Sequence, residues 1–452
     1  MHINFRRAIA FTLILAFLVL TPLLLMYTTG YRYNFKKAQV QRTGALVIET
    51  EPKAATIHLN GKEISDKTPA RLNNFLPDEY VIDVNKDGYY SWSKKLTVKP
   101  QETTFAEDII LFAKSTPEKI SDHEIKEIFF SRNQDFALFT TQNFKQDYLY
   151  LLNLNNQREK LLYNNNKLFD ITDVIWSEDD SKVFFQLDGK PNVTTTIFPQ
   201  QQINLESDIK NMPPKATNFQ WDTNNSNLLY SQINNKIHST NLLTLKSELL
   251  FTLPSAETLI DYLVFQDNIY LIQILNNKPV LTKATLKNEN NNNNKSIELK
   301  HENYHFDKTY NNKIAFIEEP NNVFYLINQD LDRILFTKQN IKNIDLHTQN
   351  NLLLLQTDQE LSYVDINRTE LSDENITRYS TGLTLATWHH ASDNYIFIQR
   401  DNQLLILERD SRDKHHIIDL GIENVDTFRI NSDDDEIILL KDNSLWKLPL
   451  TK

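Results

Sequence analysis

The longest apolar stretch of the sequence lies near its start. Residues 8–26 read AIAFTLILAFLVLTPLLLM, and no charged residue occurs between Arg7 and Arg32. About 20 helical residues, each rising ~1.5 Å, span a hydrocarbon layer ~30 Å thick. We therefore predict a transmembrane helix over 8–28, preceded by a cytoplasmic tail over 1–7. Three tyrosines at its C-terminal end, Tyr27, Tyr31 and Tyr33, suit the lipid–water boundary.

A cleaved signal peptide is the alternative interpretation of this segment. The apolar run is longer than the 7–15 residues of a signal core, and residues 27–30 lack a small-residue cleavage site, so an uncleaved anchor is favoured. The orientation is a separate question. Basic residues after the helix outnumber those before it, and charge counting alone therefore favours a cytoplasmic body. These residues are Arg32, Lys36, Lys37 and Arg42.

After a linker at 29–42, apolar and polar residues alternate in short runs over 43–113. Such alternation predicts strands with one buried face. Asn60-Gly61 predicts a two-residue hairpin turn, because both central positions of that turn need positive φ. We expect a small antiparallel β-sandwich. The pattern marks its inward positions as Leu46, Ile48, Ile57, Leu59, Tyr80, Ile82, Val84, Leu96 and Val98.

These 70 residues resemble the PEGA domain. The resemblance begins at Pro52-Lys53-Ala54-Ala55 and continues through Asn60-Gly61-Lys62 and Thr68-Pro69. It ends with Leu76-Pro77-Asp78-Glu79-Tyr80 and Gly88-Tyr89. It implies a spacer or binding module of prokaryotic envelope proteins, without catalysis, and it is the reason to place the body outside the cytoplasm.

A second pattern recurs after residue 114. Each unit has an apolar pair ending in an anchor residue, then a polar turn, then an apolar strand, and most units add two further strands. About four strands per 40–46 residues is the period of a β-propeller. The pattern around Trp176 and Trp388 is similar to degenerate WD-repeat or TolB-type blades. The anchors are Phe130, Trp176, Trp221, Val264, Phe306, Leu346, Trp388 and Ile430.

The ends of this array bear on its closure. The last unit stops one strand short at 448–450, and 117–120 reads as an isolated strand. Pairing these ends would remove two exposed strand edges. We predict an eight-bladed propeller over 114–452. Seven blades, with the unit at Phe306 or Leu346 irregular, and an open sandwich are the alternatives. Asn288–Asn294 is predicted to be a solvated loop.

Composition removes several kinds of chemistry. The chain of 452 residues has no cysteine, and its seven glycines never lie close together. Thiol catalysis, cysteine-held metals, phosphate-binding glycine loops and the G-x-S-x-G elbow are therefore excluded. A formal net charge of −11 makes nucleic acid an unexpected partner.

One segment spells a zinc-protease signature, HENYH at 301–305. The H-E-x-x-H chemistry requires a helix, so that both histidines share one face and bind one zinc. Here the context predicts strand, loop and strand, and we interpret the match as fortuitous. A zinc metallohydrolase that uses His301, Glu302 and His305 remains the alternative function.

Four other groups could bind ligands. His389-His390 and His415-His416 are expected in different strands of one blade, where adjacent residues point to opposite faces, so neither pair chelates a metal by itself and we interpret them as surface or hydrogen-bonded histidines. The acidic run 433–436 could bind calcium but sits where every unit has a turn, and we interpret it as solvated. Tyr89, Tyr90 and Trp92 could form an aromatic platform, although core packing is the favoured interpretation.

The sequence therefore predicts a mainly β protein with one N-terminal membrane helix and no enzymatic activity. We assign no catalytic, cofactor-binding or metal-binding residue, and the ligand-binding residues stay unidentified. The expected partners are the membrane and an envelope protein or glycan. The PEGA-like module would act as a spacer or wall contact, and the propeller as the binding platform.

Overall fold

The computed structural model describes residues 3–35, 37–143, 146–164, 168–196, 215–286, 295–380, 382–431 and 433–452. The chain divides into two compact units. The first contains residues 1–114 with 407–418 and 451–452, and the second contains 115–406 and 419–450. The predicted loop at Asn288–Asn294 lies outside the described residues.

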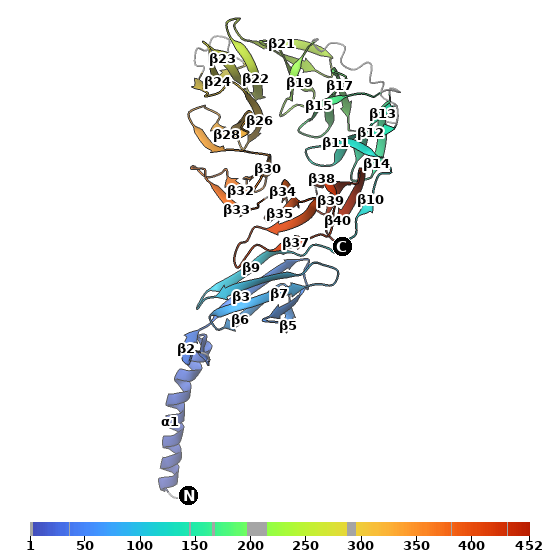
Figure 1. Ribbon diagram of the computed structural model, residues 1–452. Coiled ribbons are helices and arrows are strands. Elements are labelled where there is room, and N and C mark those ends of the chain that lie inside the picture. The colour runs from blue at the N-terminus through green and yellow to red at the C-terminus, as the bar shows by residue number, and fades with distance from the viewer. Residues whose placement is uncertain are drawn as a thin grey trace. The chain divides into compact units, whose positions relative to one another are not determined.

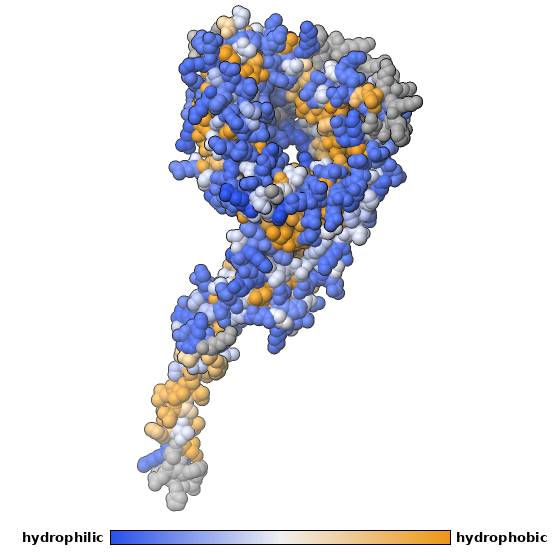
Figure 2. Space-filling view, viewed as in Figure 1, coloured by the Kyte–Doolittle hydropathy of each residue, from blue (hydrophilic) through white to orange (hydrophobic). Residues whose placement is uncertain are grey.

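The first unit begins with helix α1 (Ile3–Thr28), which includes Pro22 without interruption. Its segment Ile9–Thr28 has a mean hydropathy of 2.7, and none of it is buried. Figure 2 shows hydrophobic residues along its visible face. This confirms an N-terminal apolar helix, which suits an anchor or a signal sequence.

The segment predicted as a linker contains a β-hairpin. Strand β1 (Tyr31–Asn34) pairs antiparallel with β2 (Gln39–Arg42). The turn from the helix into β1 passes through Gly30, whose φ is +86°, a conformation that favours glycine. The prediction missed the hairpin because two four-residue strands carry too few positions to show a period.

The rest of this unit is a two-layer β-sandwich, as predicted. One sheet has the order β6-β3-β9 and the other β5-β4-β7-β8. The strands are β3 (Gly44–Glu51), β4 (Thr56–Leu59), β5 (Lys62–Lys67), β6 (Ala70–Phe75), β7 (Asp78–Asn85), β8 (Trp92–Val98) and β9 (Thr103–Ile110).

The core of the sandwich lies between these sheets and includes most of the predicted inward positions, whereas Leu59 and Tyr80 are only partly buried. Leu46, Ile48, Ile57, Ile82 and Val84 are fully buried in one cluster. Trp92 belongs to the same cluster and Tyr89 packs against it, which favours core packing over an exposed aromatic platform. The predicted tight turn is present, with φ of +51° at Asn60 and +77° at Gly61.

One pair of strands corrects the expectation of an all-antiparallel sandwich. Strands β3 and β9 pair in parallel, with Ala45 opposite Thr103 and Ile48 opposite Ala106. The chain traverses the whole second sheet between them, and this long connection lets β9 return in the same direction as β3. Alternation along a strand carries no information about such pairing.

A segment from far along the sequence completes this unit. Residues 407–418 lie against β8, where the ammonium of Lys94 is 2.7 Å from the carboxylate of Glu408. The side chains are 0% and 2% exposed, respectively. The Nε1 of Trp92 also donates to Glu408, at 3.2 Å. Glu408 of this segment therefore completes a buried ion pair with Lys94 of β8.

The histidines of this segment do not lie in a strand, contrary to the prediction for residues 415–416. The Nδ1 of His415 is 2.8 Å from the carbonyl oxygen of Glu408, and the Nε2 of His416 is 3.1 Å from that of Ser91. Burial lowers the pKa of His416. Both side chains bind backbone, so the pair is structural.

The second unit consists of β-sheets arranged around a central axis (Figure 1). In the described residues there are eight such sheets, seven of four strands and one of three. The number of blades is therefore eight, and the seven-blade alternative is wrong. The weakly patterned units at Phe306 and Leu346 are regular four-stranded sheets.

The strands follow the order of the sequence from blade to blade. The first blade contains β11 (Ile125–Phe130), β12 (Phe136–Asn143), β13 (Gln146–Asn153) and β14 (Arg158–Asn164), and the second contains β15 (Ile171–Trp176), β16 (Lys182–Leu187) and β17 (Lys190–Thr195). The third contains β18 (Thr217–Trp221), β19 (Leu228–Ile233), β20 (Lys236–Asn241) and β21 (Lys246–Thr252), and the fourth contains β22 (Thr258–Phe265), β23 (Asn268–Leu275), β24 (Lys278–Thr285) and β25 (Lys295–Glu298).

The remaining four blades repeat this arrangement. The fifth blade contains β26 (Tyr304–Tyr310), β27 (Lys313–Glu318), β28 (Val323–Asn328) and β29 (Ile334–Lys338), and the sixth contains β30 (Asn343–His347), β31 (Leu352–Gln356), β32 (Glu360–Asp365) and β33 (Asp373–Arg378). The seventh contains β34 (Leu383–His389), β35 (Ser392–Arg400), β36 (Gln403–Glu408) and β37 (Ile417–Asp419). The eighth contains β38 (Val425–Ile430), β39 (Glu436–Lys441), β40 (Ser444–Pro449) and β10 (Glu118–Lys119).

Every predicted anchor lies in the first strand of its blade. Trp388 is fully buried, and its Nε1 donates to the carbonyl oxygen of Leu352 in the preceding blade, at 3.1 Å. The hydrophobic clusters join neighbouring blades; one combines Leu138 and Leu149 of the first blade with Val183 and Phe185 of the second. Trp388 therefore helps to seal its blade against the preceding one.

The ring closes by pairing its two ends, as predicted. Strand β10 joins the last sheet at its edge, with Glu118 opposite Lys447 and Lys119 opposite Trp446. The N–H of Ile120 donates to the carbonyl oxygen of Leu445 at 2.9 Å. Ile120 also packs against a cluster that contains residues of the first and last blades.

Replacing Ile120 by proline tests this closure. The change removes the N–H that binds Leu445, and we expect the last blade to lose about 1–3 kcal/mol of stability, because proline also restricts the chain before it. Ile120→Val keeps the N–H and is the control. Hydrogen exchange of β40 in the full-length protein is the measurement. Equal protection in the two variants would show that the seam contributes nothing.

Candidate functional site

The axis of the propeller opens into a cavity between the innermost strands. Figure 2 shows the opening in the face of this unit. One part of the cavity has a volume of about 470 Å³, and an adjoining part of about 660 Å³ shares its lining residues Arg132, Glu178, Lys308 and Thr309. Residues of all eight blades contribute to the two parts, from Arg132 of the first to Asn431 of the last.

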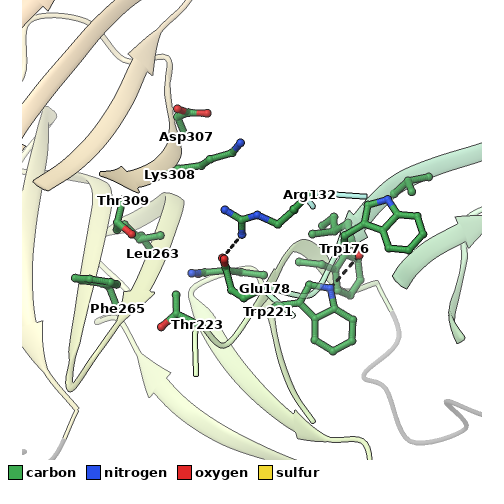
Figure 3. A pocket seen from close by; sticks show the side chains of 14 residues that line it. Arg132, Trp176, Glu178, Trp221, Thr223, Leu263, Phe265, Asp307, Lys308 and Thr309 are labelled. Carbon is green, nitrogen blue, oxygen red and sulfur yellow. Dashed lines mark hydrogen bonds and ion pairs between the residues drawn. The ribbon is translucent and has the colours of Figure 1, made fainter. Parts of the chain in front are cut away.

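Apolar and polar residues line the smaller part in similar proportion, and four of the apolar ones face each other. Trp176 and Trp221 lie on one side in Figure 3, and Leu263 and Phe265 lie on the other. The Nε1 of Trp221 donates to the carbonyl oxygen of Ile175 at 2.9 Å. The Nε1 of Trp176 is buried and has no hydrogen-bond partner among the described residues. A buried donor of this kind lacks the partner that such groups usually have.

The rim of the cavity is charged. Arg132 and Glu178 form an ion pair between the two walls (Figure 3). Lys308 is exposed, and within the described part of the chain its ammonium forms no ion pair. Asp307 accepts a hydrogen bond from the hydroxyl of Tyr310, at 2.6 Å. A ligand at the rim would therefore meet one free cation beside a paired arginine and glutamate.

The rim residues follow a positional rule that the apolar pattern of the sequence does not reveal. In most blades the residue two positions after the anchor lines the cavity. It usually lies just beyond the end of the innermost strand, whereas Lys308 lies within β26 at a shift of its register. The pattern identifies the anchors but not the direction in which the next residues point. Counting two positions onward would have located Arg132, Glu178, Thr223, Lys308, Thr348 and His390.

Carboxylates near the rim hold neighbouring blades together. Asp180 accepts hydrogen bonds from the N–H groups of Arg132 and Asn133, at 3.1 and 2.9 Å. Asp434 accepts one from the N–H of His390 at 3.1 Å, and burial raises its pKa. Asp434 is thus a buried contact between blades, and the interpretation of residues 433–436 as simply solvated is wrong at this position.

The HENYH segment is not a helix. His305 lies in β26, whereas His301 and Glu302 lie in the bend before it. Nε2 of His301 is 3.5 Å from Glu318, and Nδ1 of His305 is 3.6 Å from Glu319. Among the described residues no three histidines or carboxylates gather as metal ligands. This geometry does not favour the zinc hydrolase hypothesis.

His389 is buried in β34, and its ring stacks on Phe397 at 5.9 Å. Burial, together with the neighbouring His390 and His347, lowers the pKa of His389 to about 4. A depressed histidine pKa means that protonation favours the unfolded chain. His389 therefore does not change the free energy of unfolding above pH ~6.5, and it lowers that free energy as the pH falls toward 4.

The substitution His389→Phe should remove this acid sensitivity. Relative to the variant, the wild-type protein should lose about 3 kcal/mol of stability between pH 7 and pH 4. Denaturant unfolding at both pH values measures the difference, and His301→Gln, at a 56% exposed side chain, is the control. A constant difference between wild type and His389→Phe would contradict the assigned burial.

Comparison with known proteins identifies the small sandwich. Residues 43–107 match the PEGA domain family. This part of the chain is a PEGA domain. The match agrees with the sandwich formed by β3 to β9, and it places the tight turn at Asn60-Gly61 inside the PEGA domain. No protein of curated function matches the sequence significantly.

Solved structures that resemble the chain include a propeller. The Dos1 propeller is 10% identical, with a TM-score of 0.49, and the match covers 75% of this chain and 96% of that one. A eukaryotic initiation factor is 11% identical, with a TM-score of 0.46, covering 73% and 84%. An oligogalacturonate lyase in complex with manganese is 13% identical, with a TM-score of 0.40, covering 75% and 97%.

Proposed function

We propose that the protein is a non-enzymatic, membrane-anchored protein of the cell envelope whose propeller binds a partner at its axial cavity. The observation that carries this proposal is the cavity itself, which combines several apolar side chains with polar and charged ones. Ligand sites typically combine a volume of ~300–1,000 Å³ with mostly apolar walls and a few convergent polar groups. The partner would be an envelope protein or a glycan.

The chemistry of the cavity suits a ligand with both an apolar and an acidic part. Trp176, Leu263 and Phe265 offer apolar contact. The ammonium of Lys308 would attract an acidic group at the rim. A protein side chain or a modified sugar meets these requirements.

The anchor and the PEGA domain supply the setting. Helix α1 is long and apolar enough to cross a membrane, and a PEGA domain begins at residue 43, after the hairpin β1–β2. We propose that the PEGA domain acts as a spacer or wall contact. The body after residue 29 would then face the extracytoplasmic side, and the helix would be retained.

A fusion after Lys452 tests the orientation. We expect a reporter that is active only outside the cytoplasm to be active there, and one that is active only in the cytoplasm to be inactive. The mature N-terminus of the same protein shows whether the helix remains. The opposite reporter pattern in a full-length product would refute the orientation, and a mature N-terminus near Tyr31 would refute the anchor.

Reversal of charge at the rim tests the binding site. Lys308→Glu should reduce capture of the partner from native envelopes, because it places a third carboxylate beside Glu178 and Asp307. The control is Lys236→Glu, at an exposed position of β20. Equal loss in both variants would point to a general effect of charge rather than to the cavity.

A further inference from the structure

The hairpin β1–β2 exposes its apolar side chains and buries a polar one. Phe35 is 88% exposed, and Val40 and Tyr33 are 50% and 49% exposed, whereas Asn34 is only 4% exposed. Hairpins of water-soluble domains place apolar residues inside and polar residues outside. This inverted distribution suits a surface that meets an apolar environment.

The register puts the exposed groups on one face. Tyr33 lies opposite Val40, and Tyr31 lies opposite Arg42, so these four residues share a face of the two-stranded ribbon. The ring of Phe35 meets that of Tyr33 edge-on, with centroids 5.0 Å apart. The other face is polar, with Arg32 opposite Gln41 and Asn34 opposite Gln39.

The polar face is held by the rest of the unit. From this face, Arg32 donates to the amide oxygen of Asn74 in β6, at 3.2 Å, and to the carbonyl oxygen of Tyr27 in α1, at 2.7 Å. Its guanidinium also lies 3.7 Å from the centroid of the Tyr27 ring. Arg32 thus ties the hairpin to the C-terminal end of the helix and to the PEGA domain, and the apolar face is left outward.

The connection to the helix sets the depth of the hairpin. Helix α1 ends at Thr28 and β1 begins at Tyr31, so two residues separate them. A helix of 26 residues is about 39 Å long, compared with a hydrocarbon layer of about 30 Å. The hairpin therefore begins where the chain leaves the hydrocarbon.

The charge of this segment complements an anionic membrane surface. The first acidic residue of the chain is Glu49, and between the helix and that point the sequence carries Arg32, Lys36, Lys37 and Arg42. The whole chain has a formal net charge of −11, so the cations are concentrated here against the overall trend. Clustered Lys and Arg beside a membrane helix attract anionic lipids.

From these observations, and on the basis of the proposed anchor, we propose that the hairpin β1–β2 lies in the headgroup region of the bilayer crossed by α1. Its face of Tyr31, Tyr33, Phe35 and Val40 is turned toward the lipid, and Arg42, which shares this face, binds anionic headgroups together with Lys37. The apolar face of an interfacial segment is buried about 5–10 Å into the boundary between headgroups and acyl chains. The hairpin is thus a folded membrane contact between the helix and the PEGA domain.

A single-cysteine label tests this placement, because the chain has no cysteine of its own. Full-length Phe35→Cys carries an environment-sensitive dye in vesicles of phosphatidylcholine and phosphatidylglycerol. Lipids with a spin label either near the headgroup or deep in the acyl chain then quench the dye. Leu18→Cys, in the middle of the apolar helix, and Lys53→Cys, at an exposed position beyond β3, are the matched controls.

We expect the dye at position 35 to shift to the blue and to be quenched more by the shallow than by the deep spin label. The dye at position 18 should be quenched most by the deep label, and that at position 53 by neither. Quenching at 18 without quenching at 35 would overturn the interfacial hairpin and leave the anchor intact. Absence of quenching at 18 would overturn the anchor itself. A blue shift at 35 without quenching would mean that protein, such as a second copy, covers the face, and would also overturn the proposal.

Discussion

Replacing Lys94 by methionine should destabilise the PEGA unit by about 3–5 kcal/mol, because it leaves the buried carboxylate of Glu408 without its cation. The two groups are 2.7 Å apart and almost completely buried. The ammonium of Lys94 also donates to the carbonyl oxygen of Asp410, at 2.7 Å. Hydrogen exchange of β8 in the full-length protein measures the loss.

The double substitution Lys94→Met with Glu408→Leu separates the ion pair from packing. It removes both charges, and we expect it to recover a large part of the stability lost by Lys94→Met alone. The control is Lys95→Met, since Lys95 pairs with Glu79 at 3.1 Å where both side chains are about half exposed; such pairs contribute about 0–1 kcal/mol. A double variant as unstable as the sum of the single ones would contradict the assignment.

The stability lost in Lys94→Met should depend on pH in a defined direction. Burial raises the pKa of Glu408, against the opposing effects of Lys94 and Trp92. A raised carboxyl pKa means that the protonated form favours the folded state, so stability falls as pH rises through the folded pKa. The deficit of Lys94→Met should therefore be smaller in mild acid than at neutral pH.

Trp388→Ala should destabilise the propeller by about 3–5 kcal/mol, which is the usual cost of removing a buried tryptophan. Its ring is fully buried and lies near His347 and Tyr363, with centroids 5.8 and 6.3 Å away. The change would also leave the carbonyl oxygen of Leu352 without the indole donor. Hydrogen exchange of β31 and β34 reports the loss at this seam.

The matched control for Trp388 is the same substitution at Trp446. That residue is half-buried in β40, and its Nε1 donates to the carbonyl oxygen of Lys441 within the same blade. We expect Trp446→Ala to cost clearly less. Similar losses at the two positions would show that Trp388 does not act as the contact between two blades.

Regular repetition explains why much of the fold could be predicted. Each blade anchor recurs at a narrow spacing, and each must be apolar because it seals a seam between blades. The turn at Asn60-Gly61 was equally predictable, since both residues adopt positive φ. In both places a local physical requirement, either burial or a positive φ, restricts which residue types can occur.

Other features depend on contacts between segments far apart in the sequence. The parallel pairing of β3 with β9 cannot be predicted from the alternation of apolar and polar residues, which is the same for parallel and antiparallel strands. The burial of Lys94 against Glu408 cannot be predicted either, because a charged residue on a strand is interpreted as solvent-exposed. The interpretation of Asp434 was wrong for the same reason. The cavity rim was missed because Arg132 lies just beyond the end of β11 and Lys308 lies at a register shift within β26. At such positions the ring geometry, and not the alternation of the sequence, decides which side chains face the axis.

Photo-crosslinking in intact cells tests the central claim most directly, namely that a partner occupies the axial cavity. A photoreactive amino acid is placed at position 308, on the rim, or at position 236, on the exposed strand β20. Our account predicts a discrete crosslinked product from position 308 that is absent from position 236 and that weakens when Arg132→Glu is added. No product from position 308, or the same products from both positions, would contradict it.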